Sequence, residues 1–271
     1  MVMDGRINTI TDNVYDMANR ILSSGHAYVL NGERVIGHNE RILAASDYLS
    51  RYKSEENLPA VIAISGAEGS GRTMLAKTIM DDNHLPYSVI DLDIVEKAEK
   101  PVRVFESLNH VTEGIILRGY DGIKDKGLFI AVHNYLENAK EVVSGHSPQY
   151  VSTIILTERR VQIPFGILKR TCSIPIVYNN LDYVMMFITF CKESGYDVGG
   201  TGITMDHKIL ELICRELYGN IHLYKMWVKG ILCLKREEVE YLNGNMNIIK
   251  TLIHDTVNLG KIRYRREQED V

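Results

Sequence analysis

Hydrophobic and polar positions along the chain follow two patterns, which are short apolar runs and segments where apolar residues recur every three or four positions. The short runs, rich in β-branched residues, predict buried strands. They lie at 61–64, 86–91, 113–122, 150–157 and 172–178. Helical spacing predicts helices at 39–52, 74–79, 102–110 and 128–139. Because strands and helices alternate, the sequence predicts an α/β fold with a parallel sheet covered by helices on both faces.

The pattern changes on either side of this α/β segment. Residues 4–23 have near-helical apolar spacing and predict an amphipathic helix, and residues 27–30 predict a short extended segment before an Asn-Gly turn signal. Beyond Asn180 the spacing predicts helices only, at 183–194, 206–218, 221–234 and roughly 235–259. We therefore predict an N-terminal helical extension at 1–33, an α/β domain at 34–178 and an all-α region from 179 onward.

Composition narrows the class of protein. The 271 residues are 45% hydrophobic and 24% charged, which is ordinary for a soluble globular protein. The formal net charge of −4 excludes a polycation, so contact with nucleic acid would need a local basic patch. The sequence has no run of eighteen apolar residues and no leader pattern at its N-terminus. It therefore predicts a cytoplasmic protein without a membrane partner.

The four cysteines all lie in the second half of the chain, and no two of them form a C-x-x-C pair. We predict buried, reduced thiols, which suits a reducing compartment. A disulfide or a zinc site is the open alternative. The cysteines are Cys172, Cys191, Cys214 and Cys233.

Candidate chemistry is concentrated between the first strand of the α/β domain and the helix that follows it. The octet at 66–73, GAEGSGRT, fits the phosphate-binding pattern G-x-x-x-x-G-K-[ST] except for one position. In such a loop, backbone N–H groups and the helix N-terminus hold phosphate oxygens, and the last hydroxyl binds magnesium. The sequence thus predicts ATP or ADP with Mg²⁺ as cofactors. The predicted nucleotide-binding residues are Gly66, Gly69, Ser70, Gly71, Arg72 and Thr73, and Thr73 is also a predicted metal ligand.

The exception is Arg72, which stands where the pattern has lysine. Arginine also binds phosphate, but its planar fork cannot occupy the same point as a compact ammonium. We therefore predict that nucleotide binding survives and that hydrolysis is weak or lost. The alternative is that the glycines only form a tight turn between strand and helix.

Several segments outside the loop occur in an order that resembles the AAA+ ATPases, and within them the clamp loaders. They are VIGH at 35–38 before a helix, the octet at 66–73, ILRGYD at 116–121, IILTERR at 154–160, and IPFGILKRTC at 163–172. The resemblance covers residues 33 to 245. It implies a P-loop AAA+ sheet followed by a small all-α lid at 179–245. The remaining residues, 246–271, are predicted to form a C-terminal helix and charged tail.

The resemblance assigns catalytic roles to Asp121 and Thr157. Asp121 stands at the Walker B aspartate and is predicted as a catalytic and metal-binding residue. The residue after it is Gly122, so the water-activating glutamate of the family is absent at that place. Thr157 stands at the sensor-1 position, where the family contacts the terminal phosphate or the water. Both residues are also common at strand ends without any such role.

Two basic residues complete the predicted site. Arg170 is the candidate arginine finger, which in the family reaches the phosphates of a neighbouring subunit, with Arg159 and Arg160 as rivals. Lys225 follows a Gly-Asn pair in the lid and resembles a sensor-2 residue that contacts nucleotide. The alternatives are a solvated basic loop and an ordinary exposed lysine.

The resemblance leaves three hypotheses for function. The first is a clamp-loader-like ATP-binding subunit of a DNA-replication assembly, which associates with other AAA+ subunits or with copies of itself. The second is a nucleotide-switched adaptor similar to a helicase loader, because only about 25 residues follow the lid where clamp loaders have a collar domain. The third is a non-catalytic structural module. DNA and a sliding clamp or a helicase are the candidate partners, and whether the chain is an ATPase stays open.

Overall fold

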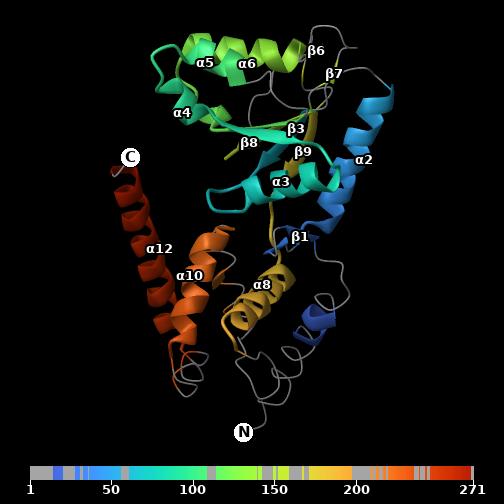
Figure 1. Cartoon of the computed structure of the whole chain (residues 1–271). Coiled ribbons are helices and arrows are strands. Elements are labelled where there is room, and N and C mark those ends of the chain that lie inside the picture. Colours follow the sequence, from blue (N-terminus) through green and yellow to red (C-terminus); the bar gives the residue numbers. More distant parts are fainter. Residues whose placement is uncertain are drawn as a thin grey trace. The chain divides into compact units, whose positions relative to one another are not determined.

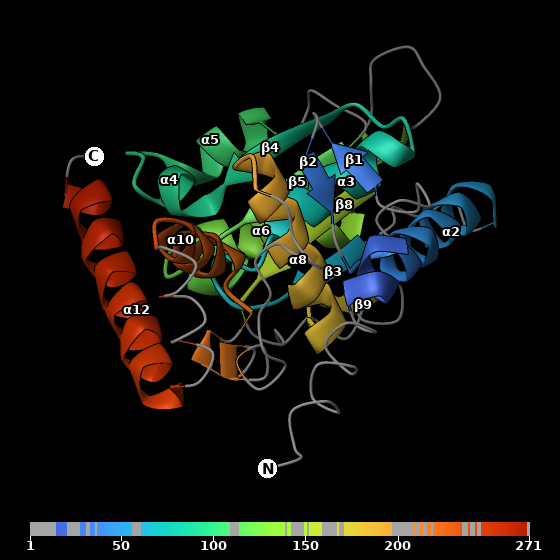
Figure 2. The same cartoon turned by 90° about the horizontal axis from the view of Figure 1, so that it is seen from below.

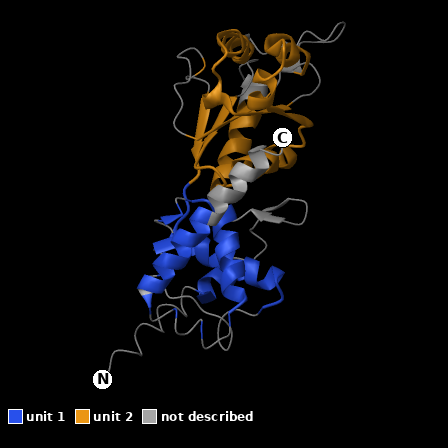
Figure 3. Cartoon of the chain, turned by 90° about the vertical axis from the view of Figure 1, so that its left-hand side faces the viewer, with its two compact units in different colours: residues 1–37, 177–271 blue, residues 38–176 orange. Residues whose placement is uncertain are grey.

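The computed structural model describes most of the chain in separate stretches. These are residues 15–20, 28–30, 33–35, 37–55, 61–108, 114–138, 140–141, 149–150, 152–158, 167, 171–196, 209, 212–213, 216–217, 219–234, 238, 242 and 245–269. The chain divides into two compact units (Figure 3). Unit 2 is the continuous segment 38–176, and unit 1 combines residues 1–37 with 177–271.

Unit 2 is built on a five-stranded sheet in the order β4-β5-β8-β3-β9. Every neighbouring pair in this sheet is parallel, which confirms the predicted sheet. The first strand of this sheet along the chain, β3, lies between β8 and β9, with Ser65 opposite Thr157 on one side and Pro175 on the other. The strands are β3 (Val61–Ser65), β4 (Tyr87–Asp91), β5 (Gly114–Arg118), β8 (Ser152–Thr157) and β9 (Thr171–Pro175).

Helices cover both faces of this sheet (Figure 1). They are α2 (Asn39–Glu55), α3 (Arg72–Asp82), α4 (Leu92–Glu96), α5 (Pro101–Leu108) and α6 (Lys126–Asn138). Because side chains alternate along a strand, Val61, Ile115 and Ile155 share one face, where they pack with Phe105 of α5 and Val132 of α6. Helix α3 lies on the opposite face and contacts β3, β5 and β8.

Three features of unit 2 differ from the sequence prediction. The third strand ends at Arg118 instead of continuing to residue 122, because Gly119 has a φ of 74° and the short 3₁₀ helix η1 (Tyr120–Gly122) follows it. Asp121 therefore lies in η1, three residues beyond the strand. Helix α4 was not predicted. The antiparallel pair β6 (Lys140–Glu141) and β7 (Gln149–Tyr150) was not predicted.

Unit 1 is mainly helical. It contains a helix at 15–20, the hairpin β1 (Tyr28–Leu30) and β2 (Glu33–Val35), and the helices α8 (Asn180–Glu193), α10 (Ile221–Leu232) and α12 (Met246–Glu269). Helix α10 packs between α8 and α12 (Figures 1 and 2). The buried Tyr224 hydroxyl donates to the carbonyl of Tyr183 at 2.9 Å, and Tyr15 packs edge-on against Phe187. Thus the helix at 15–20 shares a core with α8.

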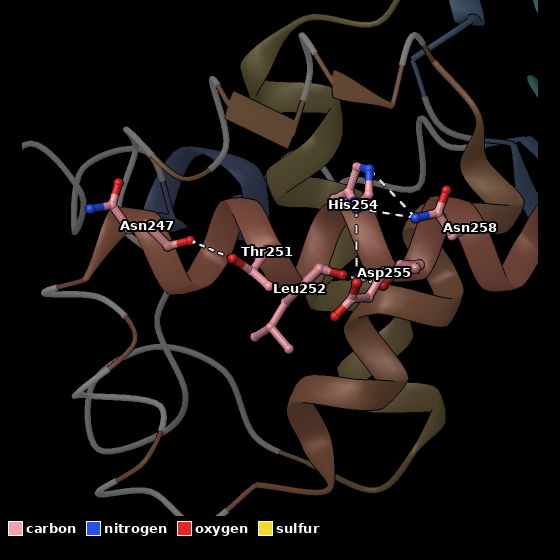
Figure 4. A network of polar contacts seen from close by, with 7 residues as sticks. Asn247, Thr251, Leu252, His254, Asp255 and Asn258 are labelled. Atoms are coloured by element: carbon pink, nitrogen blue, oxygen red, sulfur yellow. Dashed lines mark hydrogen bonds and ion pairs between the residues drawn. The ribbon is translucent and has the colours of Figure 1, made fainter.

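Helix α12 also corrects the sequence prediction, which placed a helix from about 235 to 259. It begins at Met246, after a non-helical Asn245, and continues to Glu269. Its buried side includes Ile249 and Ile253. Polar residues follow the exposed side (Figure 4), where the Asn258 amide lies 3.1 Å from Nδ1 of His254. The helix is therefore amphipathic over its described side chains.

The described cysteines, Cys172, Cys191 and Cys233, are free thiols, and Cys214 lies outside the described residues. Cys191 is buried, as predicted. Cys172 is only partly buried, and Cys233 is exposed because it lies just beyond the last turn of α10. None of the described helices is both long and apolar enough to span a membrane.

Candidate nucleotide-binding site

The glycine-rich loop at 66–71 connects β3 to α3 at the carboxyl edge of the sheet. The Gly66 N–H donates to the carbonyl of Thr157 at 3.2 Å, and the Ile176 N–H donates to the carbonyl of Ser65 at 2.7 Å. These bonds attach the start of the loop to β8 and the end of β3 to the residue after β9. The loop therefore lies at the strand ends, where open parallel sheets bind ligands.

The conformation of this loop requires glycine at several places. Gly69 and Gly71 have φ values of 72° and 87°, which residues other than glycine rarely adopt. A Cβ atom on Gly66 would lie 2.7 Å from the Ser70 hydroxyl oxygen, which is too close. The Ser70 N–H donates to the carbonyl of Ala67 at 3.1 Å, so the loop folds back on itself.

The first turn of α3 suits an anion. Its N-cap is Gly71, and no side chain caps the helix at this end. The first turn also holds no acidic residue. Because the first backbone N–H groups of a helix lack intrahelical partners and carry partial positive charge, such an end binds phosphate well. The loop and helix therefore fit the phosphates of a nucleotide, with Thr73 in the first turn.

Arg72 does not point freely into solvent. One terminal guanidinium nitrogen lies 3.8 Å from a carboxylate oxygen of Glu158, and the Arg72 side chain is only 16% exposed while that of Glu158 is 57% exposed. Glu158 follows Thr157 directly at the end of β8. The arginine in the lysine position is thus paired, across the loop, with a carboxylate at the end of the neighbouring strand.

Asp121 and Thr157 both lie beside Glu158. A carboxylate oxygen of Asp121 accepts a hydrogen bond from the Glu158 N–H at 2.8 Å. Thr157 is buried and binds the loop through its carbonyl. The structure therefore brings three predicted site residues, Arg72, Asp121 and Thr157, around one residue that the sequence analysis did not single out. The sequence signal for Glu158 was its place as an acidic residue directly after the predicted sensor-1 strand.

The region of Gly122 is occupied by another carboxylate. A Cβ atom on Gly122 would lie 3.1 Å from a carboxylate oxygen of Asp93, and the same carboxylate packs against Gly119. Partial burial raises the pKa of Asp93, and the neighbouring Asp91 and Glu96 raise it further. A glutamate at position 122 would therefore meet an acidic and crowded surrounding.

Lys225 lies on α10 in unit 1. Its ammonium is 3.3 Å from a carboxylate oxygen of Glu193 and 5.0 Å from the ring centre of Phe190, both on α8. The preceding Gly219 has a φ of 80°, and the Asn220 side chain caps α10 by accepting from the Leu223 N–H. The Gly-Asn pair thus forms the helix start, and nucleotide contact by Lys225 stays a prediction.

Some predicted features involve residues that the structure does not describe. Arg170, with its rivals Arg159 and Arg160, lies outside the described residues. Ile36 of the predicted adenine-flanking segment does too, whereas His38 is buried and its Nδ1 lies 2.8 Å from Arg41. Within the described stretches, no three His, Cys, Asp or Glu side chains cluster closely enough to hold a metal ion.

Comparison with solved structures identifies the fold. No family model and no curated protein matches the sequence. The structure resembles the Holliday junction branch migration motor RuvB of Thermotoga maritima with a TM-score of 0.54 and 12% identity, over 83% of this chain and 70% of RuvB. Two single-residue variants of that protein match with a TM-score of 0.52 each. The chain has the AAA+ fold. The glycine-rich loop before α3 lies at one edge of the parallel sheet of unit 2.

Proposed function

We propose that this chain binds ATP or ADP, with Mg²⁺, at the loop from Gly66 to Thr73 and hydrolyses ATP weakly or not at all. The observation that carries the proposal is the glycine-shaped loop, with left-handed Gly69 and Gly71, ahead of an α3 N-terminus that no side chain caps. Backbone N–H groups would hold the α- and β-phosphates, Arg72 the terminal phosphates and Thr73 the magnesium ion. The binding free energy would therefore depend on the terminal phosphate of the nucleotide.

Weak hydrolysis follows from what surrounds the loop. Arg72 replaces the phosphate-binding lysine, and Gly122 leaves the water-activating carboxylate absent at its usual place. Asp121 binds the Glu158 N–H, so at least one of its oxygens has a structural task. These features support nucleotide binding as the main use of the site.

We further propose that binding controls assembly with other AAA+ subunits or copies of this chain, in a DNA-handling complex of the clamp-loader type. The order of sequence segments supports that type, and the fold shared with RuvB, a branch migration motor, supports DNA as a partner class. Asp121, Thr157 and Arg170 would act at the terminal phosphate, Arg170 from the adjacent subunit, and Lys225 from the lid. A helicase-loader-like adaptor is the alternative within the same site chemistry.

A non-catalytic structural module is the second candidate, and the pairing of Arg72 with Glu158 favours it. Equilibrium titration of the purified chain with ATP and with ADP, in the presence of Mg²⁺, separates the two candidates. We expect saturable binding of both nucleotides, with ATP turnover below detection or very slow, with and without DNA. If neither nucleotide binds at millimolar concentration, the nucleotide-binding proposal is wrong and the structural module stands.

A further inference from the structure

We propose that Glu158 is a specificity-determining residue that lowers the affinity for nucleoside triphosphate relative to diphosphate. The inference rests on the proposed function, because it assumes that nucleotide binds at the loop. Its starting point is the ion pair between Arg72 and Glu158, which joins the phosphate loop to the end of β8 at 3.8 Å.

The position of Arg72 decides which phosphate is affected. In a loop of this pattern the backbone N–H groups hold the α- and β-phosphates, whereas the side chain before the final Ser or Thr reaches the β- and γ-phosphates. A diphosphate therefore depends mainly on the backbone of 66–71. A triphosphate gains in addition from the charge on Arg72. Any group that competes for Arg72 reduces that additional gain first.

Glu158 competes with a γ-phosphate for Arg72 because it is negatively charged and lies beside the guanidinium. Its carboxylate already lies against the guanidinium, and a γ-phosphate bound there would become its close neighbour of like charge. Triphosphate binding thus requires that the Glu158 side chain leave Arg72 or that the two anions share it. A diphosphate, one phosphate shorter, does not impose this requirement.

The backbone of Glu158 is held by hydrogen bonds, whereas its side chain is more than half exposed to solvent. The Asp121 carboxylate accepts from its N–H at 2.8 Å, and the preceding Thr157 carbonyl accepts from Gly66. Its side chain is 57% exposed, so displacement into water costs little. The residue can therefore exchange partners without unfolding the end of β8.

The test compares nucleotide selectivity, expressed as the ratio of the ADP and ATP dissociation constants, in the intact chain and in Glu158→Gln. Titrations use Mg²⁺ and a non-hydrolysable ATP analogue, with the same titration by ADP. A half-exposed ion pair of this kind is weak, so we expect the variant to bind the triphosphate about two- to fivefold more tightly and ADP within about a factor of two. Unchanged thermal unfolding checks that the variant is folded.

Glu68→Gln is the matched control, since it removes one negative charge from an exposed position of the loop and leaves the Arg72–Glu158 ion pair in place. We expect it to change both affinities by similar factors. A selectivity shift equal to that of Glu158→Gln would mean a general charge effect and would overturn the inference. In an Arg72→Ala background, Glu158→Gln should no longer change selectivity, because the competition has no target.

The outcomes separate the two proposals. If ADP binds but selectivity in Glu158→Gln equals that of the unmodified chain, or shifts toward ADP, the role proposed for Glu158 is wrong while nucleotide binding stands. If neither nucleotide binds the unmodified chain, both the proposed function and this inference fail.

Discussion

At the scale of single residues, the conformation of Gly71 sets the sharpest requirement of the loop. Its φ of 87° disfavours any β-branched side chain, and it is also the N-cap of α3. We predict that Gly71→Val weakens ADP binding about tenfold or more, because strain of about 1–3 kcal/mol forces the loop out of its present path. Calorimetric titration measures the loss, and circular dichroism shows whether α3 and the sheet remain. Retained affinity in a folded variant would refute the assignment of the loop.

We expect that ATP hydrolysis by this chain would need more than lysine at position 72 and glutamate at position 122. Arg72→Lys with Gly122→Glu supplies the expected lysine and glutamate, but the new glutamate would meet Asp93, whose carboxylate lies 3.1 Å from the Cβ position. We predict that this double variant is destabilised and that adding Asp93→Ala recovers its melting temperature, because both the crowding and the like charge are removed. Asp93→Ala alone serves as the control.

The corresponding measurement of turnover is single-turnover ATP hydrolysis by the triple variant. We expect a rate above that of the unmodified chain. Equal melting temperatures for the double and triple variants would show that Asp93 does not oppose a glutamate at position 122.

At the scale of elements, most strands and helices could be predicted from the apolar pattern, since five short apolar runs alternate with segments of helical spacing. The pattern could not locate the end of β5, because the residues after Arg118 are also compatible with a strand. The strand ends there because Gly119 has a positive φ. Helix α4 escaped prediction since it has only five residues. The partners of Arg72 and Lys225 depend on tertiary contacts and could not be predicted from spacing.

Helix α10 offers a test of backbone propensity. Gly230 lies in its last turn, and a Cβ atom there would meet nothing within 4 Å. We predict that Gly230→Ala raises the free energy of unfolding of unit 1 by about 0.5 kcal/mol, because alanine loses less backbone entropy in a helix. Fluorescence of Trp227, the single tryptophan, reports unfolding of this unit.

The matched control for that helix is Gly219→Ala. Its φ of 80° disfavours alanine, so we expect a loss of stability of about 1 kcal/mol, opposite in sign to the change at Gly230. Changes of the same sign at both glycines would contradict the described start and end of α10.

Cys191 on helix α8 makes the free energy of unfolding depend on pH. Burial raises the pKa of this thiol from 9.0 to about 12. Because the folded pKa lies above the unfolded value, the contribution is fully present below pH 9 and is lost as pH rises toward 12. We predict that Cys191→Ala reduces the slope of stability against pH in this window by up to about 1.4 kcal/mol per pH unit. Denaturant titrations at pH 8, 9 and 10 measure the slope, and an identical slope in both proteins would contradict the burial effect.

At the scale of the whole molecule, the proposed assembly makes nucleotide and association interdependent. If Arg170 contacts the terminal phosphate of a neighbouring subunit, ATP should strengthen self-association or partner binding more than ADP does. We predict that Arg170→Ala removes this difference and leaves the ATP affinity of the isolated subunit within about a factor of two. Analytical ultracentrifugation with each nucleotide, with and without DNA, measures the strength of association. A chain that stays monomeric under every condition would favour the structural module.

The division of the chain into units has a consequence for how the protein forms during synthesis. Unit 2 is one uninterrupted segment, so its sheet is complete once residue 176 has left the ribosome. The helix at 15–20 emerges much earlier, yet Tyr15 packs against Phe187 of α8 and Asn19 lies 3.4 Å from the Lys192 ammonium. The helix at 15–20 therefore cannot pack against α8 until more than 150 further residues have been synthesised. We therefore expect unit 2 to fold first, and unit 1 to fold only after α8 has been synthesised.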